Sequence, residues 1–98
     1  VQDADRLDAI GAIGIARCFA YNGHKGNPIY DRAVKPTKFD SFSSYKKHTG
    51  TAINHFYEKL LLLKDRMNTP QAKKIATHRH RVLEEYLKEF FAEVTGRA

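Results

Sequence analysis

The sequence predicts an all-α protein with three main helices and a long irregular segment between the first and the second. Apolar residues recur at helical spacing in three stretches, at about residues 3–22, 51–67 and 70–94. Between the first two stretches, glycine, proline, asparagine and serine interrupt any sustained period. A chain of 98 residues provides one small domain at most.

The first predicted helix begins with an acidic stretch and continues into an apolar run. Asp3, Asp5 and Asp8 fall within six residues, and Asp5 and Asp8, three apart, share one face of a helix. These carboxylates could complement the helix dipole, worth about 0.3–1 kcal/mol each, or supply oxygen ligands to a cation. Gly11 and Gly14 predict that another backbone packs closely against this helix, which we expect to be central.

The irregular segment 24–50 is basic and rich in aromatic residues, in a chain whose net charge is +6. Such a segment could bind a base and its phosphates through aromatic faces and positive charges. It could equally be a solvated loop whose aromatic residues attach it to the helices. The basic residues are Lys25, Arg32, Lys35, Lys38, Lys46 and Lys47, and the aromatic ones are Tyr30, Phe39, Phe42 and Tyr45.

The second predicted helix, at about residues 51–67, carries a possible phosphate-binding pair. His55 and Lys59 lie one turn apart, so both could reach a phosphate oxygen or a leaving group. The alternative is a half-buried histidine beside a lysine whose stem packs along the surface. The spacing alone leaves both interpretations open.

The third predicted helix has the clearest local signals. Thr69 can cap it and Pro70 suits its first position, while Gly96 can stop it after about residue 94. Because the connection between them is short, we expect the second and third helices to form an antiparallel pair.

Cysteine usage and hydropathy limit the class of protein. Cys18 is the single cysteine, so no intramolecular disulfide can form, and its apolar surroundings predict buried packing rather than nucleophilic chemistry. A lone reduced cysteine is typical of a cytoplasmic protein. No apolar run reaches the roughly 18 residues of a membrane span, and no nucleic-acid-binding motif is recognisable.

The acidic stretch and two later blocks carry a family resemblance. Residues 2–9 (QDADRLDA) and 11–17 (GAIGIAR) closely resemble the last motif of the HD-domain metal-dependent phosphohydrolases, in the YedJ-like branch. Residues 55–61 (HFYEKLL), with 67–69 and 72–76, resemble the C-terminal helices of that branch. The resemblance implies an HD-type helical fold and a divalent metal ion held by a His, a His-Asp pair and a final Asp. It also implies a phosphate ester, such as a nucleotide, as substrate.

On this resemblance, Asp5 matches the final metal ligand. Asp8 and Asp3 are then expected to hold a metal-bound water or to orient neighbouring groups beside the metal. The remaining candidates are His55 and Lys59 as catalytic residues and Lys25 and Lys46 as ligands of the substrate phosphate.

The other metal ligands precede this motif in the family, and these 98 residues contain no His-Asp dipeptide. We therefore expect residues 1–98 to be the C-terminal part of a single HD-type helical domain, inactive alone. An exposed apolar face would then bind the missing segment or a second copy. The alternative function is a non-enzymatic basic module that binds an acidic protein or RNA, with strongly salt-dependent affinity in the RNA case.

Overall fold

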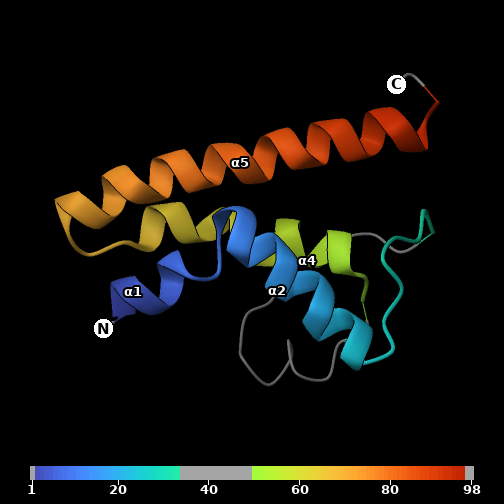
Figure 1. Cartoon of the computed structure of the whole chain (residues 1–98), viewed down its shortest axis with the longest axis horizontal. Helices are drawn as coiled ribbons and strands as arrows, with labels where there is room; N and C mark the ends of the chain where they lie inside the picture. The colour runs from blue at the N-terminus through green and yellow to red at the C-terminus, as the bar shows by residue number, and fades with distance from the viewer. Residues whose placement is uncertain (1, 34–49, 97–98) are drawn as a thin grey trace.

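The structure of the chain, a computed structural model, describes residues 2–33 and 50–96. Within these ranges every regular element is helical, which confirms the all-α prediction. A long helix lies along one side of the molecule, and the shorter elements form a second layer against it (Figure 1). The elements are α1 (Gln2–Leu7), α2 (Gly11–His24), α4 (Ala52–Glu58), the 3-10 helix η1 (Leu60–Arg66) and α5 (Pro70–Val94).

The first expected helix is in fact two helices, so the prediction of one continuous helix over residues 3–22 was wrong. Ile10 is extended and Gly11 has φ of +75°, a left-handed conformation that side chains other than glycine rarely adopt. A Cβ on Gly14 would lie 2.3 Å from the carbonyl carbon and oxygen of Ala9. The two glycines therefore permit a sharp turn with close backbone contact, as their presence suggested.

The second expected helix also breaks, at Lys59, where φ is −139° and ψ is −55°. Beyond the break the chain continues as the 3-10 helix η1, which packs against α5. Three residues per turn place Leu60 and Leu63 on the same side, and both are buried. Tertiary burial of these leucines has thus overridden the α-helical expectation.

The third helix agrees with the prediction at both ends. The Thr69 hydroxyl accepts a hydrogen bond from the Ala72 N–H at 3.1 Å, and Pro70 is the first helical residue. Gly96, just after the end of the helix, has φ of +77°. The chain passes along α4 and η1 and returns along α5, so the antiparallel arrangement is confirmed (Figure 1).

The core lies where α2, α4 and α5 meet. Phe56 of α4 is fully buried, and its ring centroid lies 5.9 Å from Phe19 and 5.8 Å from Tyr86. The rings of Phe19 and Tyr86 are also 5.8 Å apart, so one aromatic residue from each helix joins the cluster. Aromatic pairs of this kind contribute about 0.5–1.5 kcal/mol each beyond their buried area.

The start of the irregular segment is attached to the helices. The carbonyls of Pro28 and Ile29 each accept a hydrogen bond at 3.0 Å, from the N–H groups of Ala52 and Ile53 at the start of α4. The Tyr30 ring lies 5.8 Å from Phe90 and 5.4 Å from Phe91 of α5. For Tyr30 this supports the interpretation that aromatic residues attach the segment. The other three, Phe39, Phe42 and Tyr45, lie outside the described residues.

Cys18 has the buried environment that the sequence predicted. Its thiol is buried beside the Ala52 carbonyl, 3.6 Å away, and burial raises its pKa to about 11. Across residues 2–33 and 50–96, no helix has the length and apolar character that crossing a membrane requires.

Replacing the cap residue tests how much of α5 depends on it. Thr69→Ala removes the acceptor for the Ala72 N–H and should cost about 1 kcal/mol of unfolding free energy. In a domain of this size, a loss of about 1 kcal/mol lowers Tm by about 4–8 °C. Thr69→Ser keeps the hydroxyl and serves as the control. Thermal unfolding followed by circular dichroism measures Tm for both variants. An alanine variant that melts with the wild type would contradict this account of the cap.

Candidate functional site

Of the three carboxylates in the acidic stretch, Asp3 has a structural role. Its two oxygens accept hydrogen bonds from the backbone N–H groups of Asn68 at 2.8 Å and Thr69 at 3.0 Å. These bonds, first that from Asn68, lower the pKa of the Asp3 carboxyl below its ordinary value. Asp3 therefore attaches α1 to the start of α5.

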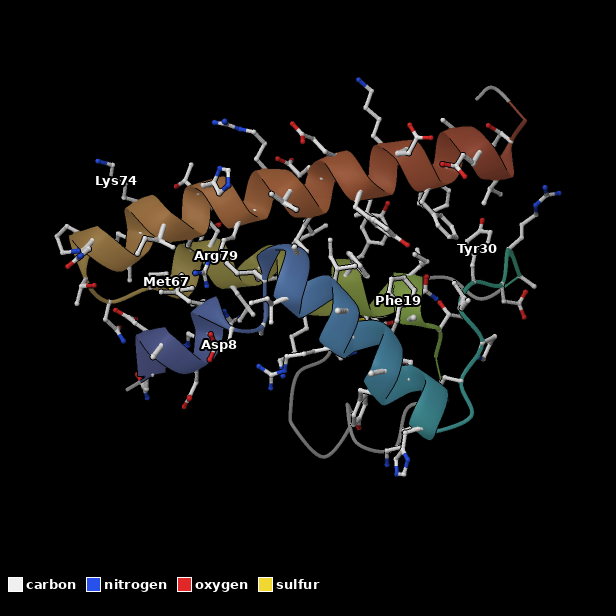
Figure 2. All side chains as sticks on the ribbon, in the orientation of Figure 1. Asp8, Phe19, Tyr30, Met67, Lys74 and Arg79 are labelled. Atoms are coloured by element: carbon white, nitrogen blue, oxygen red, sulfur yellow. The ribbon has the colours of Figure 1, made fainter. Side chains whose placement is uncertain are left out.

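Two arginines hold the rest of α1 in place. Arg79 of α5 donates a hydrogen bond of 2.8 Å from Nη1 to the carbonyl of Leu7, the last residue of α1. Its stem packs on Gly11, where an added Cβ would lie 3.0 Å from the Arg79 Cγ. Arg6 donates to the carbonyl of Arg66 at the end of η1. Figure 2 shows Arg79 between α5 and the turn that joins α1 to α2.

The sequence analysis missed Arg79, although a signal was present. Arg79 lies three residues after Ala76 and four before Leu83, both fully buried, so it occupies the apolar stripe of α5. A charged residue on a buried stripe indicates a specific partner, because burying an unpaired charge is costly. Here the partner is a backbone carbonyl that closes a helix.

Asp5 and Asp8 remain available to a ligand. Both are exposed, and among the described residues their carboxylate oxygens have no hydrogen-bonding or ionic partner. Asp8 follows α1 directly, and its N–H still bonds to the Ala4 carbonyl at 3.1 Å, so it continues the last turn of the helix. The two carboxylates therefore project from a helix whose position is set by Asp3, Arg6 and Arg79.

The described residues supply only part of a divalent metal site. Carboxylate oxygens suit a hard cation, but such an ion takes six or more oxygen ligands, from protein and water, and is rarely held by one or two carboxylates. No group of three or more His, Cys, Asp or Glu side chains in residues 2–33 and 50–96 could hold a metal ion. Asp5 and Asp8 can thus contribute to a metal site but do not complete one.

Two other predicted residues, Lys25 and His55, lie against Tyr21 near the end of α2, and Lys59 is close enough to His55 to affect its charge. The Nζ of Lys25 lies 5.8 Å from the centroid of the Tyr21 ring, and the His55 ring packs edge-on against Tyr21 at 6.5 Å. Burial, and then the positive charge of Lys59, lowers the pKa of His55 to about 4. At neutral pH His55 is therefore uncharged, and any catalytic role would be that of a neutral imidazole. Tyr21 itself was missed by the sequence analysis.

The structure does not bring the acidic pair and this second group together. Asp5 and Asp8 precede α2, whereas Tyr21 and Lys25 lie at its end, and its 14 residues span about 20 Å. A single phosphate group cannot contact both Asp5 and Lys25. Lys46, the other predicted phosphate ligand, lies outside the described residues.

The lowered pKa of Asp3 predicts a specific acid sensitivity. Because the folded-state pKa lies below the ordinary value of 3.8, the stabilisation is complete well above pH 3.8 and disappears as the pH falls through the folded-state value. In Asp3→Asn, the decrease in unfolding free energy between about pH 5 and pH 3 should be shallower than in the wild type. Urea denaturation at a series of pH values measures this slope, with Asp65→Asn as an exposed control. Equal slopes in the wild type and in Asp3→Asn would contradict the conclusion that the Asp3 carboxylate stabilises the fold by accepting hydrogen bonds from Asn68 and Thr69.

The environment of His55 predicts an imidazole that titrates near pH 4. An NMR titration of the histidine ring protons should show this midpoint. Lys59→Gln should raise the midpoint only in part, because burial is the larger cause. A wild-type midpoint near the ordinary value of 6.5 would show that His55 is not shielded from water.

The chain is similar to several known proteins, although no protein-family model matches it. A solved Lactobacillus plantarum protein is 55% identical, with a TM-score of 0.92, over 98% of this chain and 45% of that one. Bacillus subtilis YpgQ, described as uncharacterized, is 42% identical over 96 residues, which are 39% of its length. Its structure in complex with ADP matches with a TM-score of 0.77.

A Bacillus thuringiensis protein described as an HD-superfamily hydrolase is 50% identical, with a TM-score of 0.79. That match covers 96% of this chain and 44% of the hydrolase. The chain thus spans less than half the length of these relatives. Over nearly its whole length, it is similar in sequence and in fold to an HD-superfamily hydrolase.

Proposed function

We propose that this chain is part of a divalent-metal-dependent phosphohydrolase of the HD type, in the YedJ-like branch. The observation that carries the proposal is 50% identity to an HD-superfamily hydrolase over 96% of the chain. The proposed substrate is a phosphate ester, with a nucleotide favoured because YpgQ was solved in complex with ADP. The similar proteins named above do not favour the alternative of a non-enzymatic module that binds an acidic protein or RNA.

In this proposal Asp5 is a metal ligand. Its position in the QDADRLDA stretch resembles the final ligand of the family, and its carboxylate is exposed and unpaired among the described residues. A bound divalent metal ion would supply a nucleophilic water at neutral pH. The chain's own contribution is to present Asp5 from a fixed helix and to place Asp8 where it can orient a neighbouring group.

The other metal ligands are proposed to come from a part of the whole protein outside these 98 residues. Lys25 follows the far end of α2, about 20 Å along that helix from its start, and His55 packs beside Tyr21 of the same helix, so we assign Lys25, His55 and the neighbouring Lys59 to a more distant part of the substrate. Lys46 belongs to the same proposed set. The proposed location is the cytoplasm, in keeping with the lone reduced cysteine.

Metal-dependent release of phosphate from nucleotides tests the proposal. The 98-residue chain should be inactive, whereas the full-length protein should be active with a divalent metal. Loss of a residue that only orients a metal ligand typically lowers activity about 10–100-fold, so loss of the ligand itself in Asp5→Asn should lower it by at least about 100-fold. Asp65→Asn replaces another exposed aspartate, in η1, and should leave activity unchanged.

Two results would contradict the proposal. One is activity of the isolated chain that survives Asp5→Ala. The other is metal-dependent activity of the full-length protein that Asp5→Asn leaves intact.

A further inference from the structure

The exposed side of α5 separates positive from negative charge along the helix. Residues 70–81 contain no acidic residue, whereas four of the five charged residues in residues 82–94 are glutamates. A surface that only needs to be solvated is best served by interspersed charges of both signs. Figure 2 shows Lys74 on the side of α5 that faces away from the shorter helices. The exposed charged residues of α5 are Lys73, Lys74, Arg81, Glu84, Glu85, Lys88, Glu89 and Glu93.

This order of charges opposes the dipole of the helix itself. A helix is stabilised by acidic side chains near its N-terminus and by basic side chains near its C-terminus. α5 has no acidic residue in its first turn and no basic residue in its last. Its side chains therefore add to the helix dipole instead of offsetting it. The result is a helix of 25 residues, about 37 Å long, that is positive at one end and negative at the other.

Neighbouring side chains within α5 do not compensate for this arrangement. Glu89 lies one turn from both Glu85 and Glu93, and like charges at this spacing destabilise a helix. A hydrogen bond with Glu93, and then the charge of Glu93, raise the pKa of the Glu89 carboxyl. Arg81 and Glu85 are also one turn apart, yet neither forms an ion pair with any residue that the structure describes. These charges are therefore available to a partner whose own charges run in the opposite order.

We propose that the exposed side of α5 is the interface with a second copy of this chain, with the two α5 helices side by side and antiparallel. This orientation places the basic half of each helix opposite the acidic half of the other, and the two helix dipoles then offset each other. A parallel pair would place like charges together. The second copy is thus the partner whose charges this helix complements.

A twofold axis near residue 83 brings Arg81 and Glu85 to the centre of the interface. The two residues are about 40° apart around the helix, so they share its exposed side. In a twofold interface each contact occurs twice. Arg81 of each copy therefore lies opposite Glu85 of the other, and the glutamates further along each helix lie near the lysines of the other.

Because the interface is polar, the affinity should be modest and should depend on salt. Ion pairs exposed to water contribute little individually, and dissolved salt screens them. Complementary rows of charge mainly fix the orientation of the two copies and exclude wrong partners. Association should therefore be present at about 0.05 M NaCl and weaken at about 1 M NaCl, where the screening length is about 3 Å.

Charge reversal at the centre of the interface tests this inference. Sedimentation equilibrium of the full-length protein measures the dissociation constant of the dimer, which should rise at least about tenfold between the two salt concentrations. At low salt, Arg81→Glu and Glu85→Arg should each raise it at least about tenfold, because each variant places two pairs of like charges together. Asp65→Arg, at an exposed position of η1, is the control and should leave it unchanged.

An equimolar mixture of the two variants distinguishes a contact between copies from an effect within one helix. In a dimer of one Arg81→Glu chain and one Glu85→Arg chain, both central pairs again have opposite charges, so association should return to the strength of the wild type. Within each chain of the mixture, positions 81 and 85 still carry like charges. A defect that arose inside the helix would therefore persist. Both positions are exposed, so both variants should keep the circular dichroism of the wild type.

Three results would overturn the inference. The first is a wild-type protein that stays monomeric at about 0.05 M NaCl, which would leave this side of α5 to solvent alone. The second is a dimer that the two reversals weaken no more than Asp65→Arg does. The third is a mixture of the two variants that associates no better than either variant alone. Association of this kind requires no metal ion, so its test is independent of the proposed hydrolysis.

Discussion

The hydrogen bond from Arg79 to the Leu7 carbonyl is the contact on which the arrangement of the molecule depends. It caps the last turn of α1, and its side-chain stem fills the space that Gly11 leaves at the start of α2. One side chain of α5 thereby fixes the angle between two helices that are joined by a sharp turn. Asp3 and Arg6 add further bonds to the backbone around η1 and the start of α5. The backbone that carries Asp5 and Asp8 is held in place for this reason, although neither carboxylate makes a stabilising contact itself.

Most of the fold could be predicted because its signals are local. Thr69 and Pro70 mark the start of α5 without reference to the rest of the chain, and Gly96 marks its end. The two helix breaks could not be predicted, because apolar residues continue across both of them. Only tertiary contacts distinguish them: the close approach of Ala9 to Gly14, and the burial of Leu60 and Leu63 in three-residue turns.

Some features of the candidate site could likewise be predicted from the sequence, and others could not. Spacing placed Asp5 and Asp8 on one face of a helix, but only the family resemblance selected Asp5 as the metal ligand. The structural role of Asp3 depends on N–H groups 65 and 66 residues away, which no local pattern contains. The closeness of His55 and Lys59 could be predicted from their spacing, but their position near Lys25, through the Tyr21 ring that Lys25 and His55 contact, could not. The distance of Lys25 and Tyr21 from Asp5 follows from the length of α2.

The long sequence separation of the bonds around α1 has a consequence for biosynthesis. Leu7 and Arg79 are 72 residues apart, and Asp3 and Asn68 are 65 apart. Closing loops of this length has an entropic cost that must be met before such contacts form. During translation, α1 therefore emerges long before the segments that hold it. Asp5 reaches its final position only after the ribosome has released α5 as far as Arg79, so a nascent chain cannot assemble this corner of the proposed metal site early.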